Sequence, residues 1–237
     1  MPLVVIVKTG DAFPEVIEQH GDFGALFEAP ILRGNPRATV TTWDPRSEPE
    51  APSLDTLDAI VITGSNSMVS DKEPWSEALK PWLRQARARD IPMFGVCYGH
   101  QLMAEAFGGS AGDHPDGREA GTFELERTDA SNMDALFSQL PTRFLTHLTH
   151  GQSVLDVPSD ALVLAFNDHD PYQALRYGTR QWSVQFHPEF NADITRAYLE
   201  RVKDALEEQG DDVSELINRI EETPHSTSLL ERFSALL

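Results

Sequence analysis

The sequence predicts an α/β protein with a mainly parallel central sheet, covered by helices on both faces, and an added antiparallel section. In the first half of the chain, short apolar runs alternate with amphipathic helical stretches. These runs are apolar throughout, as expected for strands that are buried on both faces of a parallel sheet. In the second half, short strand-like segments follow one another closely, which favours antiparallel pairing.

The first half is expected to contain four strands and two helices. The expected strands are residues 3–7, 38–42, 59–63 and 92–96. Residues 75–89 predict a helix because large apolar side chains recur there at a spacing of three and four. A second helix is expected over residues 98–107, where the pair Gly108 and Gly109 ends it.

The second half contains shorter elements. Its expected strands are residues 122–126, 162–166, 173–177 and 182–186, and its expected helix is 191–208. We predict one domain over residues 1–206 and a helical appendage over 207–237. The amphipathic last ten residues are expected to pack on the core of this chain, with a contact to another protein as the alternative.

Composition excludes several classes of function. The 237 residues include 38 acidic and 19 basic side chains, which gives a net charge of −19. This balance disfavours nucleic acid and anionic membrane surfaces as partners, because both require clustered Lys and Arg. The single cysteine excludes an internal disulfide bond and a cysteine-rich zinc site. With no apolar segment long enough for a signal peptide or a membrane span, we expect a cytoplasmic protein.

Cys97 is the candidate nucleophile because it lies between an expected strand and an expected helix. Gly95 and Gly99 flank it at two residues' distance, which allows a sharp turn that exposes the side chain. The N-terminus of the following helix points at the sulfur and favours the thiolate. The amide of Tyr98 can face a developing oxyanion. The alternative, a buried and unreactive cysteine, is disfavoured by the flanking glycines.

His187 is the candidate general base. It follows the expected strand 182–186, at the edge of the sheet where α/β sites lie. Pro188 favours an extended His187, so the side chains of His187 and Glu189 project to the same side. Glu189 then binds one imidazole nitrogen and leaves the other for Cys97, as in a catalytic triad. The alternatives are an ordinary loop or a metal site, for which no further ligand is suitably spaced.

Gly64 and Ser65 begin a loop of small residues after the expected strand 59–63. The amides of such a loop can form part of an oxyanion hole, and a plain turn is the alternative. No phosphate-binding Gly-Lys-Ser/Thr sequence and no dinucleotide-binding Gly-x-Gly-x-x-Gly sequence is present. We therefore expect no cofactor and no metal.

Five other histidines are given no catalytic role. His100 lies in the expected helix after Cys97, where we expect it to pack or to form hydrogen bonds locally. The others are expected to be solvated in loops or on helix faces: His20, His114, His169 and His225.

Together these motifs resemble those of class I glutamine amidotransferases, in particular the free-standing type similar to the glutaminase domain of GMP synthase. Residues 95–101, Gly-Val-Cys-Tyr-Gly-His-Gln, match the nucleophile motif of the family. Residues 185–190, Gln-Phe-His-Pro-Glu-Phe, match its His-x-Glu motif, and Gly64-Ser65 match its oxyanion loop. The resemblance covers roughly residues 1–206 and implies a flavodoxin-like fold of three layers.

The resemblance also implies a mechanism. The Cys97 thiolate would attack the side-chain amide of glutamine, while the amides of Gly64 and Tyr98 hold the oxyanion. His187, held by Glu189, would protonate the departing ammonia and then activate water to hydrolyse the γ-glutamyl thioester. The resemblance places the substrate-binding positions of the family at Gly64, Ser65, Gln101, Thr149, His150 and Gln152.

Two departures from the family pattern leave the substrate open. Ser65-Asn66-Ser67 stand where many synthase domains have Gly-Pro after the glycine, and Gln152 stands where an acidic residue is common. Because residues 207–237 are too few for a synthetase active site, we expect any ammonia acceptor to be a separate synthetase subunit. The first alternative is an independent γ-glutamyl peptidase or hydrolase, which both departures favour. The second is a catalytically silent binding protein, which the presence of Cys97, His187 and Glu189 disfavours.

Overall fold

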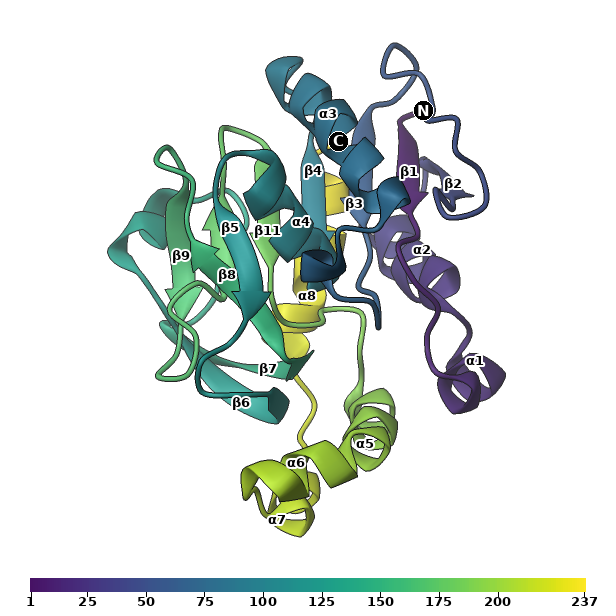
Figure 1. Ribbon diagram of the computed structural model, residues 1–237. Helices are drawn as coiled ribbons and strands as arrows, with labels where there is room; N and C mark the ends of the chain where they lie inside the picture. The colour runs from purple at the N-terminus through teal and green to yellow at the C-terminus, as the bar shows by residue number, and fades with distance from the viewer.

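The computed structural model describes residues 1–237, and a nine-stranded sheet forms its centre (Figure 1). The strand order is β2-β1-β3-β4-β11-β10-β9-β6-β7. The bounds of these strands are β1 Leu3–Val7, β2 Thr39–Trp43, β3 Ala59–Ile62, β4 Met93–Val96, β6 Glu119–Arg127, β7 Arg143–His150, β9 Leu162–Phe166, β10 Ala174–Arg176 and β11 Gln181–Val184. A separate two-stranded sheet pairs β5 (Ser110–Asp113) with β8 (Gln152–Asp156).

The large sheet has a parallel part and an antiparallel part. All neighbours from β2 to β11 in the sheet order are parallel. From β11 onward, through β10, β9, β6 and β7, each neighbouring pair is antiparallel. The predicted fold class, a mainly parallel sheet with an added antiparallel section, is therefore confirmed.

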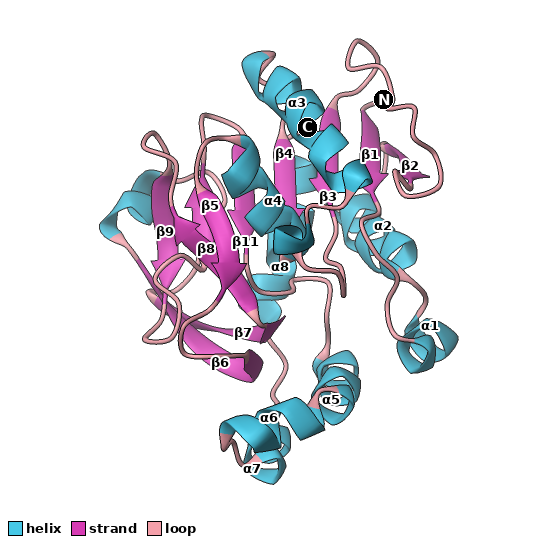
Figure 2. Cartoon of the chain, in the orientation of Figure 1, coloured by secondary structure: helices cyan, strands magenta, loops and turns pink.

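Helices cover both faces of the parallel part (Figure 2). The helices are α1 Pro14–His20, α2 Phe23–Gly34, α3 Pro74–Ala88, α4 Tyr98–Ala106, α5 Ala192–Arg201, α6 Lys203–Gln209, α7 Val213–Asn218 and α8 Pro224–Ala235, with short 3₁₀ turns η1 Val69–Asp71 and η2 Asp129–Met133. In Figure 1, α3 and α4 lie in front of the sheet, α2 and α8 lie behind it, and α5 to α7 project below. No helix combines the length and the apolar character needed to cross a bilayer.

The core is divided between the two faces of the sheet by the alternation of side chains along each strand. Val4 and Ile6 of β1 pack with α2 and α8 in one apolar cluster. Val5 and Val7 belong to a second cluster, on the face covered by α3 and α4. Burial on both faces explains why β1 is apolar at every position rather than at every second one.

The C-terminal helix α8 is part of the main core. Phe233 is buried, with its ring centre 5.5 Å from that of Phe94 in β4 and 6.2 Å from that of Trp182 in β11. The Ser234 hydroxyl donates to the carbonyl of Ile31 in α2 at 2.7 Å. Helix α8 thus covers the face of the sheet opposite to α3 and α4. A domain boundary at residue 206 stays a prediction.

Several elements differ from the sequence prediction. The helix expected over residues 191–208 is divided at Val202, whose backbone (φ −98°, ψ 10°) leaves the helical region between α5 and α6. The prediction assigns no helix to α1, which is short and buries only Val16, or to α2, whose apolar pattern is interrupted by Pro30. The long strand β7 is also absent from the prediction, since its polar residues hide the alternation that marks a strand.

Candidate active site

Cys97 lies at the turn between β4 and α4 with a left-handed backbone, φ 51° and ψ −101°. For a residue with a side chain this conformation is strained, and such strain is typical of nucleophiles at strand-to-helix turns. Both flanking glycines are required by close packing. A Cβ atom on Gly95 would lie 2.7 Å from the Gly99 carbonyl oxygen, and one on Gly99 would lie 2.7 Å from the Ile62 carbonyl oxygen.

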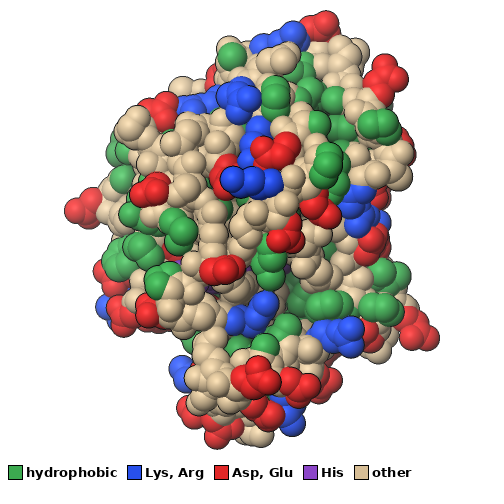
Figure 3. All heavy atoms as spheres, viewed as in Figure 1, with side chains coloured by type: hydrophobic (Ala, Val, Ile, Leu, Met, Phe, Trp, Pro, Cys, Tyr) green, Lys and Arg blue, Asp and Glu red, His purple; other side chains and the backbone are tan.

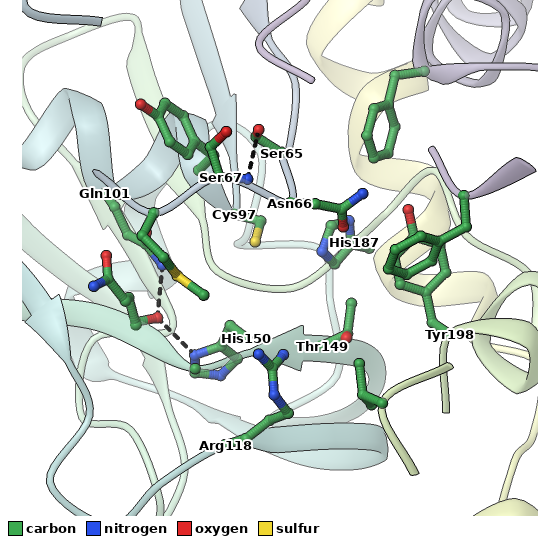
Figure 4. A pocket seen from close by; sticks show the side chains of 17 residues that line it. Ser65, Asn66, Ser67, Cys97, Gln101, Arg118, Thr149, His150, His187 and Tyr198 are labelled. Carbon is green, nitrogen blue, oxygen red and sulfur yellow. Dashed lines mark hydrogen bonds between the residues drawn. The ribbon is translucent and has the colours of Figure 1, made fainter. Parts of the chain in front are cut away.

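His187 and Glu189 form the pair expected from the sequence. His187 Nδ1 lies 2.7 Å from Glu189 Oε1, and both side chains are buried. The His187 amide donates to the carbonyl of His147 in β7 at 2.8 Å, and the imidazole stacks on the ring of Phe190. The other ring nitrogen, Nε2, is buried without a hydrogen-bond partner. In Figure 4 the ring of His187 stands beside the sulfur of Cys97.

The electrostatic setting of His187 favours the protonated imidazole. Burial alone would lower the pKa of His187, but the charges of Glu189 and Cys97, together with hydrogen bonding, raise it to about 10. His147 shows the opposite behaviour: burial and the neighbouring His187 lower its pKa to about 4. A protonated His187 next to the sulfur of Cys97 has a proton available for a leaving group.

The loop that begins at Gly64, after β3, approaches Cys97 and His187. A Cβ atom on Gly64 would lie 3.0 Å from His187 Cε1 and 3.6 Å from Cys97 Cβ, so a larger residue would crowd the pair. The Thr9 hydroxyl donates to the Gly64 carbonyl at 2.9 Å and fixes the loop. The amides of Gly64 and Tyr98 donate to no group of the protein, so both are free to hold an oxyanion.

A cavity of about 250 Å³ opens above Cys97 and His187 (Figure 4). Most of the residues predicted from the sequence line it, namely Ser65, Cys97, Tyr98, Gln101, Thr149, His150, Gln152 and His187. Glu189 is bound to the far side of the His187 ring, and Gly64 lies against that ring. The structure therefore brings the predicted catalytic, oxyanion and substrate-binding residues to one place.

Two of the residues predicted to bind substrate already have their polar groups engaged. The ring nitrogens of His150 lie 3.0 Å from the carbonyl oxygen of Gln152 and 3.1 Å from Glu119 Oε2. The side-chain amide of Gln152 donates to Ser70 at 2.6 Å and to Asp113 at 2.8 Å. His150 thus contributes the surface of its ring to the cavity. The side chain of Gln152 is held at the cavity wall by its hydrogen bonds to Ser70 and Asp113.

Gln101 and Thr149 are better placed to contact a ligand. The side-chain nitrogen of Gln101 donates to the Gln152 carbonyl at 2.6 Å and to Gln185 at 3.0 Å, which fixes the orientation of its amide. Its oxygen accepts no hydrogen bond within the chain. The Thr149 hydroxyl also forms none, and Thr149 stands at the cavity wall in Figure 4.

The prediction for two histidines is wrong. His114 and His169, expected in solvated loops, stack on each other with ring centres 4.2 Å apart. His114 is buried, and its Nδ1 accepts the amide of Asp116 at 3.1 Å. Polar neighbours in the sequence suggest exposure, but the fold brings the two loops together. His100 behaves as expected: it lies 2.7 Å from Ser183 Oγ, and burial lowers its pKa to about 4.

Several lining residues were not identified from the sequence. Arg118 enters the cavity from the segment before β6, and Tyr198 and Val202 reach it from α5 and the α5–α6 junction. Phe13 and Phe23 complete an apolar side. None belongs to a recognisable motif, and only the folding of distant segments brings them to Cys97.

Residues 29–203 match the family described as Glutamine amidotransferase class-I. The chain belongs to the class I glutamine amidotransferase family, as its motifs suggest. It is 38% identical over 181 residues to a glutamine-hydrolyzing GMP synthase subunit of Methanopyrus kandleri, covering 73% of this chain and 87% of that protein. It is 29% identical over 156 residues to gamma-glutamyl peptidase 5 of Arabidopsis thaliana, covering 65% of this chain and 62% of that protein. The matched part thus falls short of two thirds of the peptidase.

Two solved structures share the fold. A glutamine amidotransferase from Thermotoga maritima superposes with a TM-score of 0.75 at 22% identity, covering 99% of this chain and 96% of that one. A glutamine amidotransferase from Methylobacillus flagellatus gives a TM-score of 0.75 at 17% identity, covering 99% of this chain and 91% of that one. At these identities the similarity concerns the fold.

Proposed function

We propose that this protein hydrolyses the side-chain amide of glutamine with Cys97 as nucleophile, His187 as general acid and base, and Glu189 as the residue that orients His187. The observation that carries this proposal is the strained turn at Cys97, with the buried His187–Glu189 pair beside it. A nucleophile, a base and an orienting carboxylate within one cavity are the requirements of acyl transfer. Membership of a glutamine amidotransferase family supports the same assignment.

The proposed reaction has two stages. The Cys97 sulfur forms a bond to the amide carbon, and the carbonyl oxygen becomes an oxyanion that the amides of Gly64 and Tyr98 stabilise. His187 gives its proton to the nitrogen, the carbon–nitrogen bond breaks, and ammonia leaves a γ-glutamyl thioester. His187 then takes a proton from water, whose oxygen attacks the thioester carbon. Glutamate departs, and the proton held by His187 restores the resting pair.

Turnover of purified protein tests this mechanism. We expect release of equal amounts of glutamate and ammonia from glutamine, and a γ-glutamyl adduct on Cys97 detectable by mass spectrometry after rapid acid quenching. Cys97→Ser should lower turnover by about three orders of magnitude or more while the midpoint of thermal unfolding stays unchanged. Retention of full activity by Cys97→Ser would show that another residue is the nucleophile.

A second candidate function is a γ-glutamyl peptidase, because only the leaving amine differs between the two reactions. The observation in its favour is the apolar side of the cavity, lined by Phe13, Phe23, Tyr198 and Val202. An ammonia leaving group needs no such surface, whereas the rest of a peptide does. Comparing kcat/KM for glutamine with that for γ-glutamyl dipeptides decides between them. A higher value for glutamine would reject the peptidase.

If glutamine is the substrate, we propose that the ammonia is used by a separate synthetase chain. The support is the similarity to a relative named as one subunit of a GMP synthase, which this chain covers over 87% of its length. This proposal predicts slow glutamine hydrolysis by the isolated protein and stimulation when the synthetase and its substrates are added. Unchanged hydrolysis in the presence of an active synthetase that binds this chain would contradict it.

A further inference from the structure

Arg118 is a positively charged side chain in the candidate active site that has no partner of its own. Its guanidinium group lines the same cavity as Cys97 and His187 and forms no hydrogen bond or ion pair within the protein. Only its main chain is bound, since the amide donates to Gln209 Oε1 at 2.7 Å and the carbonyl accepts from Gln209 Nε2 at 2.9 Å. Other basic side chains, such as Arg46 and Lys80, each contact two carboxylates.

The missing partner of Arg118 is not explained by a shortage of acidic residues. The chain has twice as many acidic as basic side chains, and Glu119 is the next residue. Both oxygens of Glu119 are engaged elsewhere, Oε1 by Asn167 and Oε2 by His150 and Gln173. The fold therefore directs the nearest carboxylate away from Arg118 and leaves the guanidinium group facing the cavity.

The surroundings of Arg118 keep this charge partly buried and in position. Burial lowers the pKa of Arg118, while the charge of Cys97 acts in the opposite direction. A Cβ atom on Gly151 would lie 3.2 Å from Arg118 Nη2, so the glycine leaves room for the guanidinium group against the chain. Figure 4 shows Arg118 beside His150 and Thr149, reaching up toward the space next to Cys97. Holding an unpaired charge in a partly buried place costs free energy, which a bound anion would offset.

We propose that Arg118 binds a carboxylate of the substrate and thereby selects γ-glutamyl compounds that carry a carboxylate at that position. A guanidinium group binds a carboxylate through two parallel hydrogen bonds, which fixes direction as well as charge. In a protein of net charge −19, a local positive group also offsets the repulsion that an anionic substrate meets. The proposal rests on the proposed hydrolysis at Cys97 and adds the residue that determines its specificity.

The carboxylate has two sources in such a substrate. One is the α-carboxylate of the γ-glutamyl group, which glutamine and every γ-glutamyl peptide share. The other is the carboxylate of the leaving amino acid, which a γ-glutamyl peptide has and glutamine lacks. Two matched pairs of substrates separate these sources: L-glutamine with its α-amide, and γ-glutamyl-alanine with γ-glutamyl-alaninamide.

The experiment measures kcat/KM for these four compounds with the unaltered protein, Arg118→Gln and Arg118→Lys. Loss of a charged hydrogen-bonded pair should lower kcat/KM about 10- to 100-fold where the bound carboxylate is present. If Arg118 binds the α-carboxylate, Arg118→Gln loses activity on every compound except the α-amide of glutamine. If it binds the leaving group, only γ-glutamyl-alanine is affected. Arg118→Lys should retain part of the selectivity, because it keeps the charge without the paired geometry.

A matched control is Arg219→Gln, which removes an exposed charge that follows α7, outside the cavity, and pairs with Glu215. It should leave all four values unchanged. An equal loss on all four compounds with Arg118→Gln, or no loss on any, would overturn the proposal while leaving hydrolysis at Cys97 intact. If the unaltered protein turns over none of them, calorimetric binding of L-glutamine and of γ-glutamyl-alanine to Cys97→Ser, with and without Arg118→Gln, decides the matter. Equal affinities of the two variants for both ligands would then reject a role for Arg118.

Discussion

Close approach of backbone and side chains at single residues shapes the candidate active site. Gly64 admits the ring of His187, and Gly99 admits the turn that carries Cys97. His187 is held from both sides, by the Glu189 carboxylate at 2.7 Å and by its own amide on His147. These constraints fix Cys97 and His187 relative to each other before any ligand arrives, which the proposed acyl transfer requires.

At this scale, Glu189→Gln tests the orienting carboxylate. We expect activity to fall by about two to four orders of magnitude, less than in Cys97→Ser, because in the proposed mechanism Glu189 positions His187 and does not react. The pKa of His187 should also fall from about 10, since the amide carries no charge to raise it. A loss as complete as that of Cys97→Ser would assign Glu189 a direct part in the chemistry.

The same substitution should change how stability depends on pH. The pKa of His187 in the folded protein, about 10, lies above its ordinary value of 6.5. The stability contributed by its proton is therefore fully present below pH 6.5 and is lost as the pH rises toward 10. Urea unfolding at several pH values between these limits should show this decline in the unaltered protein and a flatter curve in Glu189→Gln. If the free energy of unfolding changed with pH in the same way in both proteins, Glu189 would not be the cause of the raised pKa of His187.

Comparison of two buried histidines tests the choice of base. His187→Ala should lower activity at least about 100-fold, the scale of general acid–base catalysis. His100→Ala should affect activity less, because His100 contacts Ser183 rather than the cavity. Steady-state kinetics with glutamine measure both, with the exposed His225→Ala as control. A larger loss of activity in His100→Ala than in His187→Ala would contradict the assignment of His187 as the general base.

At the scale of elements, the site depends on where strands end. The loop after β3, the turn after β4 and the His187 segment after β11 follow neighbouring parallel strands, so they meet at one edge of the sheet. Strand β7 and the segment that leads into its antiparallel neighbour β6 bring Thr149 and Arg118 to the same cavity. Helix α5 adds Tyr198 from the other side, packed on Phe13 with ring centres 4.7 Å apart.

Helix α8 offers a test of an element that lies outside the cavity. Phe233→Ala should lower the free energy of unfolding by about 3–5 kcal/mol, because it removes a fully buried ring against Phe94 and Trp182. Activity of the fraction that remains folded should persist, since Phe233 does not line the cavity. Chemical denaturation measures the change, and Leu236→Ala is a suitable control because Leu236 is 46% exposed. Similar values for both variants would show that α8 contributes little to the core.

At the scale of the whole molecule, negative charge dominates the surface. In Figure 3 acidic side chains gather over α6 and α7, in the lower part of the view. This segment of sequence supplies Asp204, Glu207, Glu208, Asp211, Asp212 and Glu215. Such a surface favours solubility and a basic partner, and it repels anionic ligands except where Arg118 faces the cavity.

The net charge of −19 predicts that salt stabilises the folded protein. Raising sodium chloride from about 20 mM to about 300 mM shortens the screening length several-fold and weakens the repulsion among carboxylates. We expect the midpoint of thermal unfolding to rise by a few degrees, as measured by circular dichroism near neutral pH. A midpoint that falls with salt would show that local pairs, such as Arg46 with Asp11 and Asp44, outweigh the overall repulsion.

The sequence alone determined the fold class, the family and the residues proposed to react. Continuous apolar runs such as 3–7 indicate strands buried on both faces, and the single cysteine, Cys97, is the one thiol that can serve as nucleophile. The sequence His187-Pro188-Glu189 encodes its own geometry, because proline extends the chain and places both side chains together. Signals of this kind are local, so they survive without knowledge of the fold.

Which other side chains face Cys97 depends on how distant segments fold together. Arg118, Phe13 and Tyr198 come from segments far apart in the sequence, and no local pattern distinguishes them from surface residues. The same holds for His114 and His169, whose stacking depends on two loops meeting, and for α2, whose burial overrides the effect of Pro30. Propensity and motif act over a few residues, whereas the shape and charge of a cavity depend on contacts between distant parts of the chain.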